Sequence, residues 1–339
     1  MVGKRLFEKL LVIAEVGMTH DGSFGLACQL LRAAAAAGAD VVKFQLHISE
    51  YETTRDAPNP PYFGGESRYD YFNRTRLSDD SLSKICSLSR ELGVIPCISV
   101  FSEESALLAA KCGFAIIKIP SGEVSNIPLL RVINRLNLPV IISSGMSSWS
   151  ELDQAIAELR AVPDLCVLQC TSLYPTPSDR VGLNVLQELR ERYNLPVGLS
   201  DHTLSSATSV AAVVLGARVV EKHFTLSKLM FGPDAKFSLE PSEFEKLVGD
   251  CKFVADSMES PVDKDDLAPL ETMKQVFQKS VVAKKVVRKG ELFTNENLTV
   301  KKPGTGIPAR EYFNIIGKKA LRDLAVDDLL ETTDISDFG

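Results

Sequence analysis

Short apolar segments of strand length alternate with helical segments through the first three quarters of the chain, and this alternation constrains the fold most strongly. Each apolar segment is nearly continuous, as in "LLVIAEVG", which is typical of parallel strands buried on both faces of a sheet. A segment rich in alanine or leucine follows each one, as in repeated βαβ units. The predicted strands are residues 10–17, 40–45, 94–101, 115–121, 139–145, 166–172, 196–202 and 217–224.

Eight strand–helix units in about 260 residues predict an α/β fold, the (β/α)8 TIM barrel. The alternative is a doubly wound open sheet, but no G-x-G-x-x-G motif follows the first strand. In a TIM barrel the C-terminal strand ends carry the active site, and polar residues gather at these ends, which predicts an enzyme. They are Glu15, Lys43, Gln45, Ser99, Lys118, Ser121, Ser143, Ser172, Tyr174, Ser200, His202 and His223.

The sequence changes character beyond the last of these units and predicts three parts. Residues 1–260 form the barrel, residues 261–278 are a charged, proline-containing linker, and residues 279–339 form a small β-rich module. Within this module, residues 283–298 align weakly with residues 320–335, which suggests a pseudo-symmetric domain. About sixty residues is marginal for independent stability, so we expect the module to dock on the barrel or on a partner chain.

A long connection, residues 47–78, follows the second predicted strand and is rich in proline, tyrosine and arginine. Long connections in compact domains are usually lids or binding loops, although a tolerated surface insertion is the alternative.

Composition narrows the classes of function. The formal charge of −6 argues against nucleic acid as a partner, because phosphate binding needs a basic face. No apolar run reaches the roughly 18 residues of a membrane span. The seven cysteines are odd in number and form no C-x-x-C pair, which indicates reduced thiols in a cytoplasmic protein.

Two histidines, His202 and His223, end neighbouring strands of the expected barrel and could share one divalent metal ion. Imidazole suits Mn²⁺, Zn²⁺, Fe²⁺ and Ni²⁺ better than Ca²⁺. A role as general base or hydrogen-bonding group fits a strand-end histidine equally well.

The remaining polar residues at the strand ends favour an anionic ligand. Lys43 and Lys118 lie among serine hydroxyls, as phosphate or carboxylate binding requires, while a Schiff-base lysine is the competing interpretation. Glu15, Glu123 and Asp234 offer carboxylates for proton transfer or for holding hydroxyl groups.

The motifs "IAEVGMTHDGS", "GADVVKFQ", "KIPSGE", "ISSGM", "CTSLYPTP", "GLSDHT", "EKHFTL" and "GPDAKFSLEP" occur in the order found in the sialic acid synthase family. These enzymes condense phosphoenolpyruvate with a sugar and make nonulosonic acids. The tail "VVRKGELFTNENLTVKKPGTGI…IIGKKALRDL" resembles the family's C-terminal antifreeze-like (SAF) domain. The resemblance covers essentially the whole chain.

This resemblance implies a reaction of phosphoenolpyruvate with an N-acetylated hexosamine aldehyde, giving a nine-carbon 2-keto sugar acid and phosphate by C–O cleavage. The acceptor would be N-acetylmannosamine or a 2,4-diacetamido-6-deoxy hexose. The family also implies a divalent metal, Mn²⁺ first and Mg²⁺ or Co²⁺ as alternatives. It further implies a homodimer in which the SAF domain reaches over the barrel of the partner.

The resemblance also assigns roles to individual residues. Phosphoenolpyruvate would be held by Lys43, Lys118, Ser121, Ser143 and Ser200, with Ser99 and Ser172 as further substrate contacts. Gln45, Tyr174, Asp234 and Lys302 would face the acceptor sugar. His202 and His223 would be the metal ligands, Glu123 the proton-transfer carboxylate, and Glu15 a further catalytic carboxylate.

Some positions depart from the family pattern, mostly on the acceptor side. Ser172 replaces a frequent Asn, Lys302 stands where some relatives carry Arg, Thr19 replaces a common Asn, and Ala235 a frequent His. These departures leave the acceptor sugar open. The alternatives to the synthase are a Schiff-base lyase of such sugars, a condensing enzyme for a sugar phosphate, and a non-catalytic carbohydrate-binding or ice-binding protein.

Overall fold

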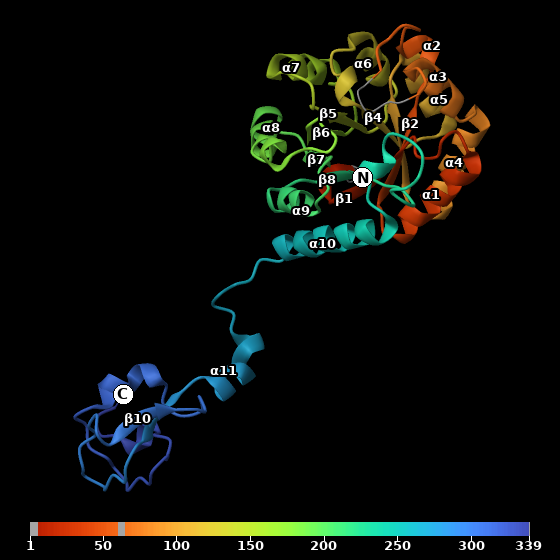
Figure 1. Ribbon diagram of the computed structural model, residues 1–339. Coiled ribbons are helices and arrows are strands. Elements are labelled where there is room, and N and C mark those ends of the chain that lie inside the picture. The colour runs from red at the N-terminus through yellow and green to blue at the C-terminus, as the bar shows by residue number, and fades with distance from the viewer. Residues whose placement is uncertain (1–5, 60–64, 339) are drawn as a thin grey trace. The chain divides into compact units, whose positions relative to one another are not determined.

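The computed structural model describes residues 6–59 and 65–338, and the chain forms two units, Met1–Ser260 and Pro261–Gly339. The first unit is a closed barrel of eight parallel strands in sequence order, surrounded by helices (Figure 1). The predicted TIM barrel is therefore confirmed. The strands are β1 (Leu11–Gly17), β2 (Val41–Leu46), β3 (Ile95–Val100), β4 (Ile116–Ile119), β5 (Val140–Ser143), β6 (Leu165–Cys170), β7 (Val197–Asp201) and β8 (Val219–His223).

Helices cover the outside of the barrel and bury their apolar faces against the strands. Ser23, Ser78, Ser102 and Ser148 begin four of them, because each hydroxyl accepts a hydrogen bond from a backbone N–H of the first turn. The outer helices are α1 (Phe24–Ala36), α4 (Asp79–Glu91), α5 (Glu103–Cys112), α6 (Ile127–Ile133), α7 (Trp149–Glu158), α8 (Val185–Tyr193), α9 (Ala207–Val214) and α10 (Pro241–Glu259).

The long connection after β2 contains two helices, α2 (Ser49–Glu52) and α3 (Arg68–Thr75). Residues 60–64 of this connection lie outside the described residues. The hydroxyl of Ser49 donates to the carbonyl oxygen of Tyr69 at 2.9 Å and so ties α2 to α3.

Alternation along the strands separates an apolar layer inside the barrel from the polar strand ends. Ile13, Val41, Cys97, Ile116, Ile141 and Val219 belong to one buried apolar cluster, together with Phe7, Leu11, Cys166 and Leu168. Side chains two residues apart on a strand share a face, so the polar residues that follow this layer also point inward. The layer fills the N-terminal half of the barrel, and the polar residues lie at the C-terminal end.

Strands β7 and β8 approach each other closely at Gly198. A Cβ atom at this position would lie 2.2 Å from the carbonyl oxygen of Val219, which is far inside van der Waals contact. Only glycine fits here. The close approach sets the register that pairs Ser200 with Glu221 and Asp201 with Lys222.

The second unit contains α11 (Glu271–Phe277), a small antiparallel sheet of β9 (Ser280–Ala283) and β10 (Leu298–Lys301), and the short helix α12 (Tyr312–Ile315). Val287 and Leu324, which occupy equivalent positions in the predicted repeat, exchange both backbone hydrogen bonds at 3.0 and 2.8 Å. The two copies of the repeat therefore pair with each other around a pseudo-twofold axis.

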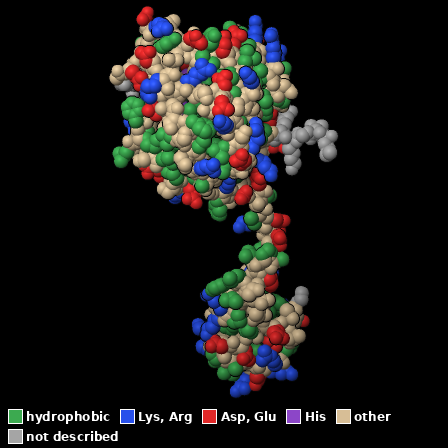
Figure 2. All heavy atoms as spheres, turned by 90° about the vertical axis from the view of Figure 1, so that its right-hand side faces the viewer, with side chains coloured by type: hydrophobic (Ala, Val, Ile, Leu, Met, Phe, Trp, Pro, Cys, Tyr) green, Lys and Arg blue, Asp and Glu red, His purple; other side chains and the backbone are tan. Residues whose placement is uncertain are grey.

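On the face shown in Figure 2, acidic and basic side chains are interspersed over both units. None of the helices in the described ranges is both long and apolar enough to cross a bilayer. All seven cysteines are free thiols.

Candidate active site

A pocket of about 360 Å³ opens at the C-terminal end of the barrel, a size that suits a small ligand. The structure brings together the site residues predicted in the barrel, and all of them line this pocket. They are Glu15, Lys43, Gln45, Ser99, Lys118, Ser121, Glu123, Ser143, Ser172, Tyr174, Ser200, His202, His223 and Asp234.

Two buried lysines share one carboxylate at the floor of the pocket. Lys43 Nζ lies 3.2 Å from Glu221 Oε2, and Lys118 Nζ donates to Glu221 Oε1 at 3.3 Å. Lys43 also lies 3.1 Å from Glu15 Oε2. The hydroxyl of Ser200 donates to Glu221 Oε1 at 2.8 Å. The ammonium groups are thus held in place before any ligand arrives.

Attraction between opposite charges keeps Lys43 and Glu221 ionised despite their burial. Burial opposes the charge of Lys43, but Glu15 and Glu221 together raise its pKa. Burial likewise opposes ionisation of Glu221, yet Lys118 and Lys43 hold the pKa of that carboxyl well below its usual range. For Lys118, burial lowers the pKa, and the attraction of Glu221 offsets only part of this effect. An anionic ligand would compete with Glu15 and Glu221 for these ammonium groups.

Glu221 is a residue that the sequence analysis missed. It lies two positions before His223 on β8, so it points to the same inner face. Because side chains two residues apart on a strand share a face, counting back two residues from His223 would have identified Glu221. On β8 only His223 was predicted as a site residue, although on β2 and β7 two polar residues spaced by two, Lys43 with Gln45 and Ser200 with His202, were both predicted.

Several polar atoms that line the pocket are buried without a hydrogen-bond partner in the described ranges. They are Glu15 Oε2, Arg68 Nε, Ser143 Oγ, Glu221 Oε2 and His223 Nδ1. The two carboxylate oxygens are nevertheless paired with the Lys43 ammonium group, at 3.1 and 3.2 Å, so a ligand would have to compete for that group. Folded proteins leave few buried polar atoms unsatisfied. A polar ligand with both donors and acceptors would satisfy this set.

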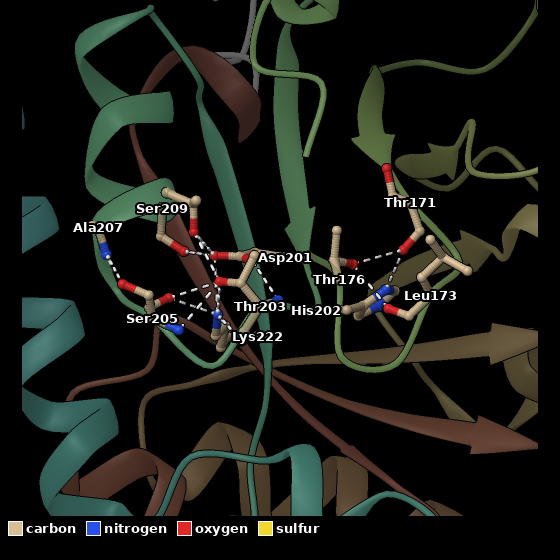
Figure 3. Close-up of polar contacts among 11 residues, drawn as sticks. Thr171, Leu173, Thr176, Asp201, His202, Thr203, Ser205, Ala207, Ser209 and Lys222 are labelled. Carbon is tan, nitrogen blue, oxygen red and sulfur yellow. Dashed lines mark hydrogen bonds and ion pairs between the residues drawn. The ribbon is translucent and has the colours of Figure 1, made fainter. Parts of the chain in front are cut away.

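His202 and His223 lie side by side, with ring centroids 5.5 Å apart. The carbonyl oxygen of Thr171 is 3.0 Å from His202 Nδ1, so this nitrogen donates and Nε2 is the ring nitrogen left to bind a metal when the ring is neutral (Figure 3). Metal-binding histidines commonly make such a bond through the other ring nitrogen. The ring of Tyr174 stacks on His202 at 4.2 Å.

These two histidines fit a metal ion that keeps open coordination positions. His223 Nδ1 is buried and has no hydrogen-bond partner within residues 6–59 and 65–338. Over the same ranges, no group of three or more His, Cys, Asp or Glu side chains is arranged to hold a metal. An ion bound by the histidines would therefore take its other ligands from water or substrate.

A second buried ion pair lies on the opposite side of the same two strands (Figure 3). Lys222 Nζ is 3.0 Å from Asp201 Oδ2 and donates to the carbonyl oxygens of Thr203 and Ser205 at 2.6 and 2.9 Å. Asp201 precedes His202, and Lys222 precedes His223. The pair therefore connects the two strands at the residues next to the histidines.

Carboxylates surround the outer half of the pocket. Burial raises the pKa of Glu123, whose Oε2 accepts a hydrogen bond from Asn126 at 2.7 Å. A Cβ atom on Gly17 would lie 2.9 Å from Asp234 Oδ2 and 3.4 Å from both Gln45 Nε2 and Glu15 Oε1, so these three side chains converge on one point.

The long connection after β2 contributes His47, Arg68, Tyr71 and Phe72 to the pocket. The expectation of a binding loop therefore agrees with the geometry, although the sequence analysis named none of these as site residues. It also did not predict α3, which carries the last three of them. Arg68 lies over Phe72, with Cζ 5.9 Å from the ring centroid.

The other departures from the family pattern lie in different surroundings. Thr19 is buried, and its hydroxyl donates to the carbonyl oxygen of Val16 at 2.7 Å. Ala235 is also buried and follows Asp234. Lys302 belongs to the second unit, where its Nζ is 5.0 Å from the ring centroid of Phe277.

Comparisons with known proteins agree with this geometry. A model of the NeuB family matches residues 30–263, and a model of the SAF domain matches residues 278–336. The N,N'-diacetyllegionaminic acid synthase of Campylobacter jejuni is 36% identical over 332 residues, covering 95% of this chain and 99% of that protein.

Two further proteins extend the comparison. The human N-acetylneuraminate-9-phosphate synthase is 33% identical over 337 residues, covering 97% of this chain and 93% of that protein. The crystal structure of the N-acetylneuraminic acid (sialic acid) synthetase from Leptospira borgpetersenii, a complex with citrate, matches with a TM-score of 0.68. That match has 27% identity and covers 79% of this chain and 91% of the other.

Proposed function

Because this chain belongs to the NeuB family and has a SAF domain at its C-terminus, we propose that it condenses phosphoenolpyruvate with an acetamido hexose. The resemblance seen in the sequence is confirmed, and the chain is an enzyme of the nonulosonic acid synthase type. The proposed products are a nine-carbon 2-keto sugar acid and phosphate.

The observation that carries this proposal is the pair of buried lysines beside serine hydroxyls at the floor of the pocket. Lys43 and Lys118 would neutralise the phosphate and carboxylate of phosphoenolpyruvate, while Ser121, Ser143 and Ser200 would supply hydrogen bonds. Since the lysines are already fixed by Glu221, they would hold the ligand in attack geometry without further ordering.

In the proposed reaction, C3 of phosphoenolpyruvate attacks the aldehyde carbon of the open-chain sugar. Water then adds at C2, and phosphate leaves as the C2–O bond breaks. Glu123 is our candidate for the proton transfers, because burial raises its pKa and brings it nearer to the working pH.

His202 and His223 would hold a divalent metal, for which Mn²⁺ is our first choice. Such an ion supplies Lewis-acid polarisation of an aldehyde oxygen when it is bound. The protein's own contribution is the orientation of His202 by the Thr171 carbonyl oxygen.

For the acceptor we propose an unphosphorylated acetamido hexose, either N-acetylmannosamine or a 2,4-diacetamido-6-deoxy hexose. Glu123 and Asp234 line the same pocket as Glu15, whose charge is balanced by Lys43 at 3.1 Å, and Arg68 interacts electrostatically with Glu123. Carboxylates suit hydroxyl groups and repel a second phosphate. We also propose a homodimer in which Lys302 of the SAF domain reaches the acceptor in the partner's barrel.

A Schiff-base lyase is the second candidate function, and one observation favours it. Burial lowers the pKa of Lys118, as imine-forming lysines require. The hydrogen bond from Lys118 to Glu221 and the nearby Lys43 favour anion binding instead. Borohydride would trap an imine with the sugar acid only if the lyase proposal is correct.

The decisive experiment measures phosphate release from phosphoenolpyruvate with Mn²⁺ across N-acetylmannosamine, its 6-phosphate and 2,4-diacetamido-6-deoxy hexoses. We expect release with an unphosphorylated acceptor and its loss in His202→Ala. If a folded, metal-loaded protein releases no phosphate with any of these sugars, the synthase proposal is wrong.

A further inference from the structure

A chain of hydrogen bonds runs along one wall of the pocket, from the long connection after β2 to Lys43. His47 Nδ1 is 2.7 Å from Glu52 Oε1, and His47 Nε2 is 3.0 Å from Gln45 Oε1. Gln45 Nε2 then donates to Glu15 Oε1 at 2.6 Å. The ion pair between Glu15 and Lys43 completes the chain.

The Lys43 end of this chain fixes the orientation of every group in it. Glu15 is paired with the Lys43 ammonium group, so it is a carboxylate and can only accept hydrogen bonds. The amide NH₂ of Gln45 must therefore face Glu15, and its carbonyl oxygen must face His47. It follows that His47 donates from Nε2 to Gln45 and, because Glu52 Oε1 lies 2.7 Å from Nδ1, that this nitrogen also shares a proton with the Glu52 carboxylate.

The ring of His47 is also held mechanically. It lies between Phe72 and Phe101, with ring centroids 3.6 and 3.9 Å away and interplanar angles of 9° and 21°. Glu52, which contacts Nδ1, is itself fixed because its Oε2 accepts a hydrogen bond from the backbone N–H of Ile48 at 3.2 Å. The side chains of His47 and Glu52 are buried.

The amide of Gln45 lies in the part of the pocket that we propose for the acceptor sugar. Its Nε2 lies near Gly17, together with Asp234 and Glu15. One N–H of this amide is bonded to Glu15, and the other makes no hydrogen bond within residues 6–59 and 65–338. The side chain lines the pocket and is only partly buried.

We propose that His47 is a positioning residue that locks the amide of Gln45, so that Gln45 can only donate a hydrogen bond to the acceptor sugar. The sugar atom that contacts Gln45 is then an accepting oxygen, a carbonyl or hydroxyl oxygen. This inference rests on the proposed function, because it names the acceptor contact of that same site. The proposal also gives α3 a role, because Phe72 on this helix and Phe101 form a clamp around the ring of His47.

A double-mutant cycle tests this coupling. His47→Phe keeps an aromatic ring between Phe72 and Phe101 but removes both nitrogens, so Gln45 is free to turn over. We expect the KM for the acceptor to rise about tenfold, the loss typical of one hydrogen bond, while the KM for phosphoenolpyruvate changes less than twofold. In Gln45→Ala, the added His47→Phe should have no further effect.

Two further variants keep the test interpretable. His47→Phe leaves the carboxylate of Glu52 buried without its partner, so the cycle is repeated with Glu52→Gln. Arg74→Met is the matched control, because Arg74 anchors α3 to Asp21 and Glu66 at 2.9 and 2.8 Å without lining the pocket. Additive effects of His47 and Gln45, or an equal rise of the acceptor KM in Arg74→Met, would overturn the proposal.

An imidazole nitrogen spectrum of the ¹⁵N-histidine-labelled protein supplies a readout that needs no activity. We expect a proton on Nε2 of His47, assigned by comparison with His47→Phe. A deprotonated Nε2 would show that the amide is not held as proposed. If the wild type releases no phosphate, the proposed function fails while this spectrum still decides the orientation of Gln45.

Discussion

Glu221 and Lys222 are neighbours on β8, yet their side chains enter two buried ion clusters on opposite sides of the barrel wall. On the inner side, Glu221 joins Lys43 and Lys118, and the Ser143 hydroxyl in the same pocket has no hydrogen-bond partner among the described residues. On the outer side, Lys222 directs its three N–H groups to Asp201 and two carbonyl oxygens.

The outer cluster is complete by itself. Asp201 Oδ1 accepts from the backbone N–H of Thr203 at 2.8 Å, and Oδ2 accepts from the hydroxyls of Thr208 and Ser209 at 2.6 and 2.7 Å. Full satisfaction is what a buried network needs in order to support a fold. The difference indicates that the outer cluster stabilises the barrel, whereas the inner cluster keeps hydrogen-bonding capacity for a ligand.

Lys222→Met breaks the outer cluster and should reduce the stability of the protein more than any of the other proposed changes. This change leaves Asp201 as an uncompensated buried charge, which typically costs about 3–5 kcal/mol of unfolding free energy. Urea unfolding measures it. Lys252→Met, which breaks the more exposed pair with Asp40, is the control and should cost less than about 1 kcal/mol. Equal losses in the two variants would contradict the assigned role.

Lys43→Met should reduce activity strongly and stability only slightly, the reverse of Lys222→Met. We expect kcat/KM for phosphoenolpyruvate to fall about a hundredfold, as when one preorganised electrostatic contact is removed. The unfolding free energy should fall less than in Lys222→Met, since Glu221 keeps Lys118 and Ser200 as partners. A variant that loses stability but retains its rate would refute this division between the two clusters.

His20 differs from both clusters: its Nε2 is buried and has no hydrogen-bond partner within the described ranges, yet the residue does not line the pocket. Burial lowers the pKa of His20 to about 4 from the ordinary 6.5. Between these pH values the unfolded chain binds the extra proton, so stability falls as the pH drops below 6.5. The linkage amounts to about 2 kcal/mol at pH 5.

The measurement compares urea unfolding of the wild type and His20→Gln at pH 7.5 and pH 5. The stability of the wild type should fall by about 2 kcal/mol more than that of the variant. Parallel losses would mean that other groups cause the acid sensitivity.

The sequence predicted the barrel because each strand is a continuous apolar run, a local property. It also located the lysines and histidines, since the parallel strands of a barrel end at one rim. It could not give the pairing of Glu15 with His223, which exists only because β1 closes the barrel against β8. The clamp around His47 was equally hidden, because Phe72 and Phe101 come from separate segments that meet only in the fold.

Gly145→Ala is a purely steric change beside the pocket, and it should alter ligand binding only modestly. A Cβ atom at this position would lie 2.6 Å from the hydroxyl oxygens of both Ser121 and Ser172, so both would have to turn away. We expect the KM for phosphoenolpyruvate to rise up to about tenfold, as when roughly one hydrogen bond to the ligand is lost. The acceptor KM should remain unchanged.

Gly122→Ala is the matched control, because its Cβ would meet only the Met146 side chain at an ordinary 3.6 Å. If the KM for phosphoenolpyruvate rises in Gly145→Ala but not in Gly122→Ala, the phosphate or carboxylate of the ligand contacts Ser121 and Ser172. Unchanged kinetics in both variants would mean that these hydroxyls do not contact phosphoenolpyruvate. Phosphoenolpyruvate binding would then depend on the charged groups of the inner cluster, which are Lys43, Lys118 and the carboxylates that hold them.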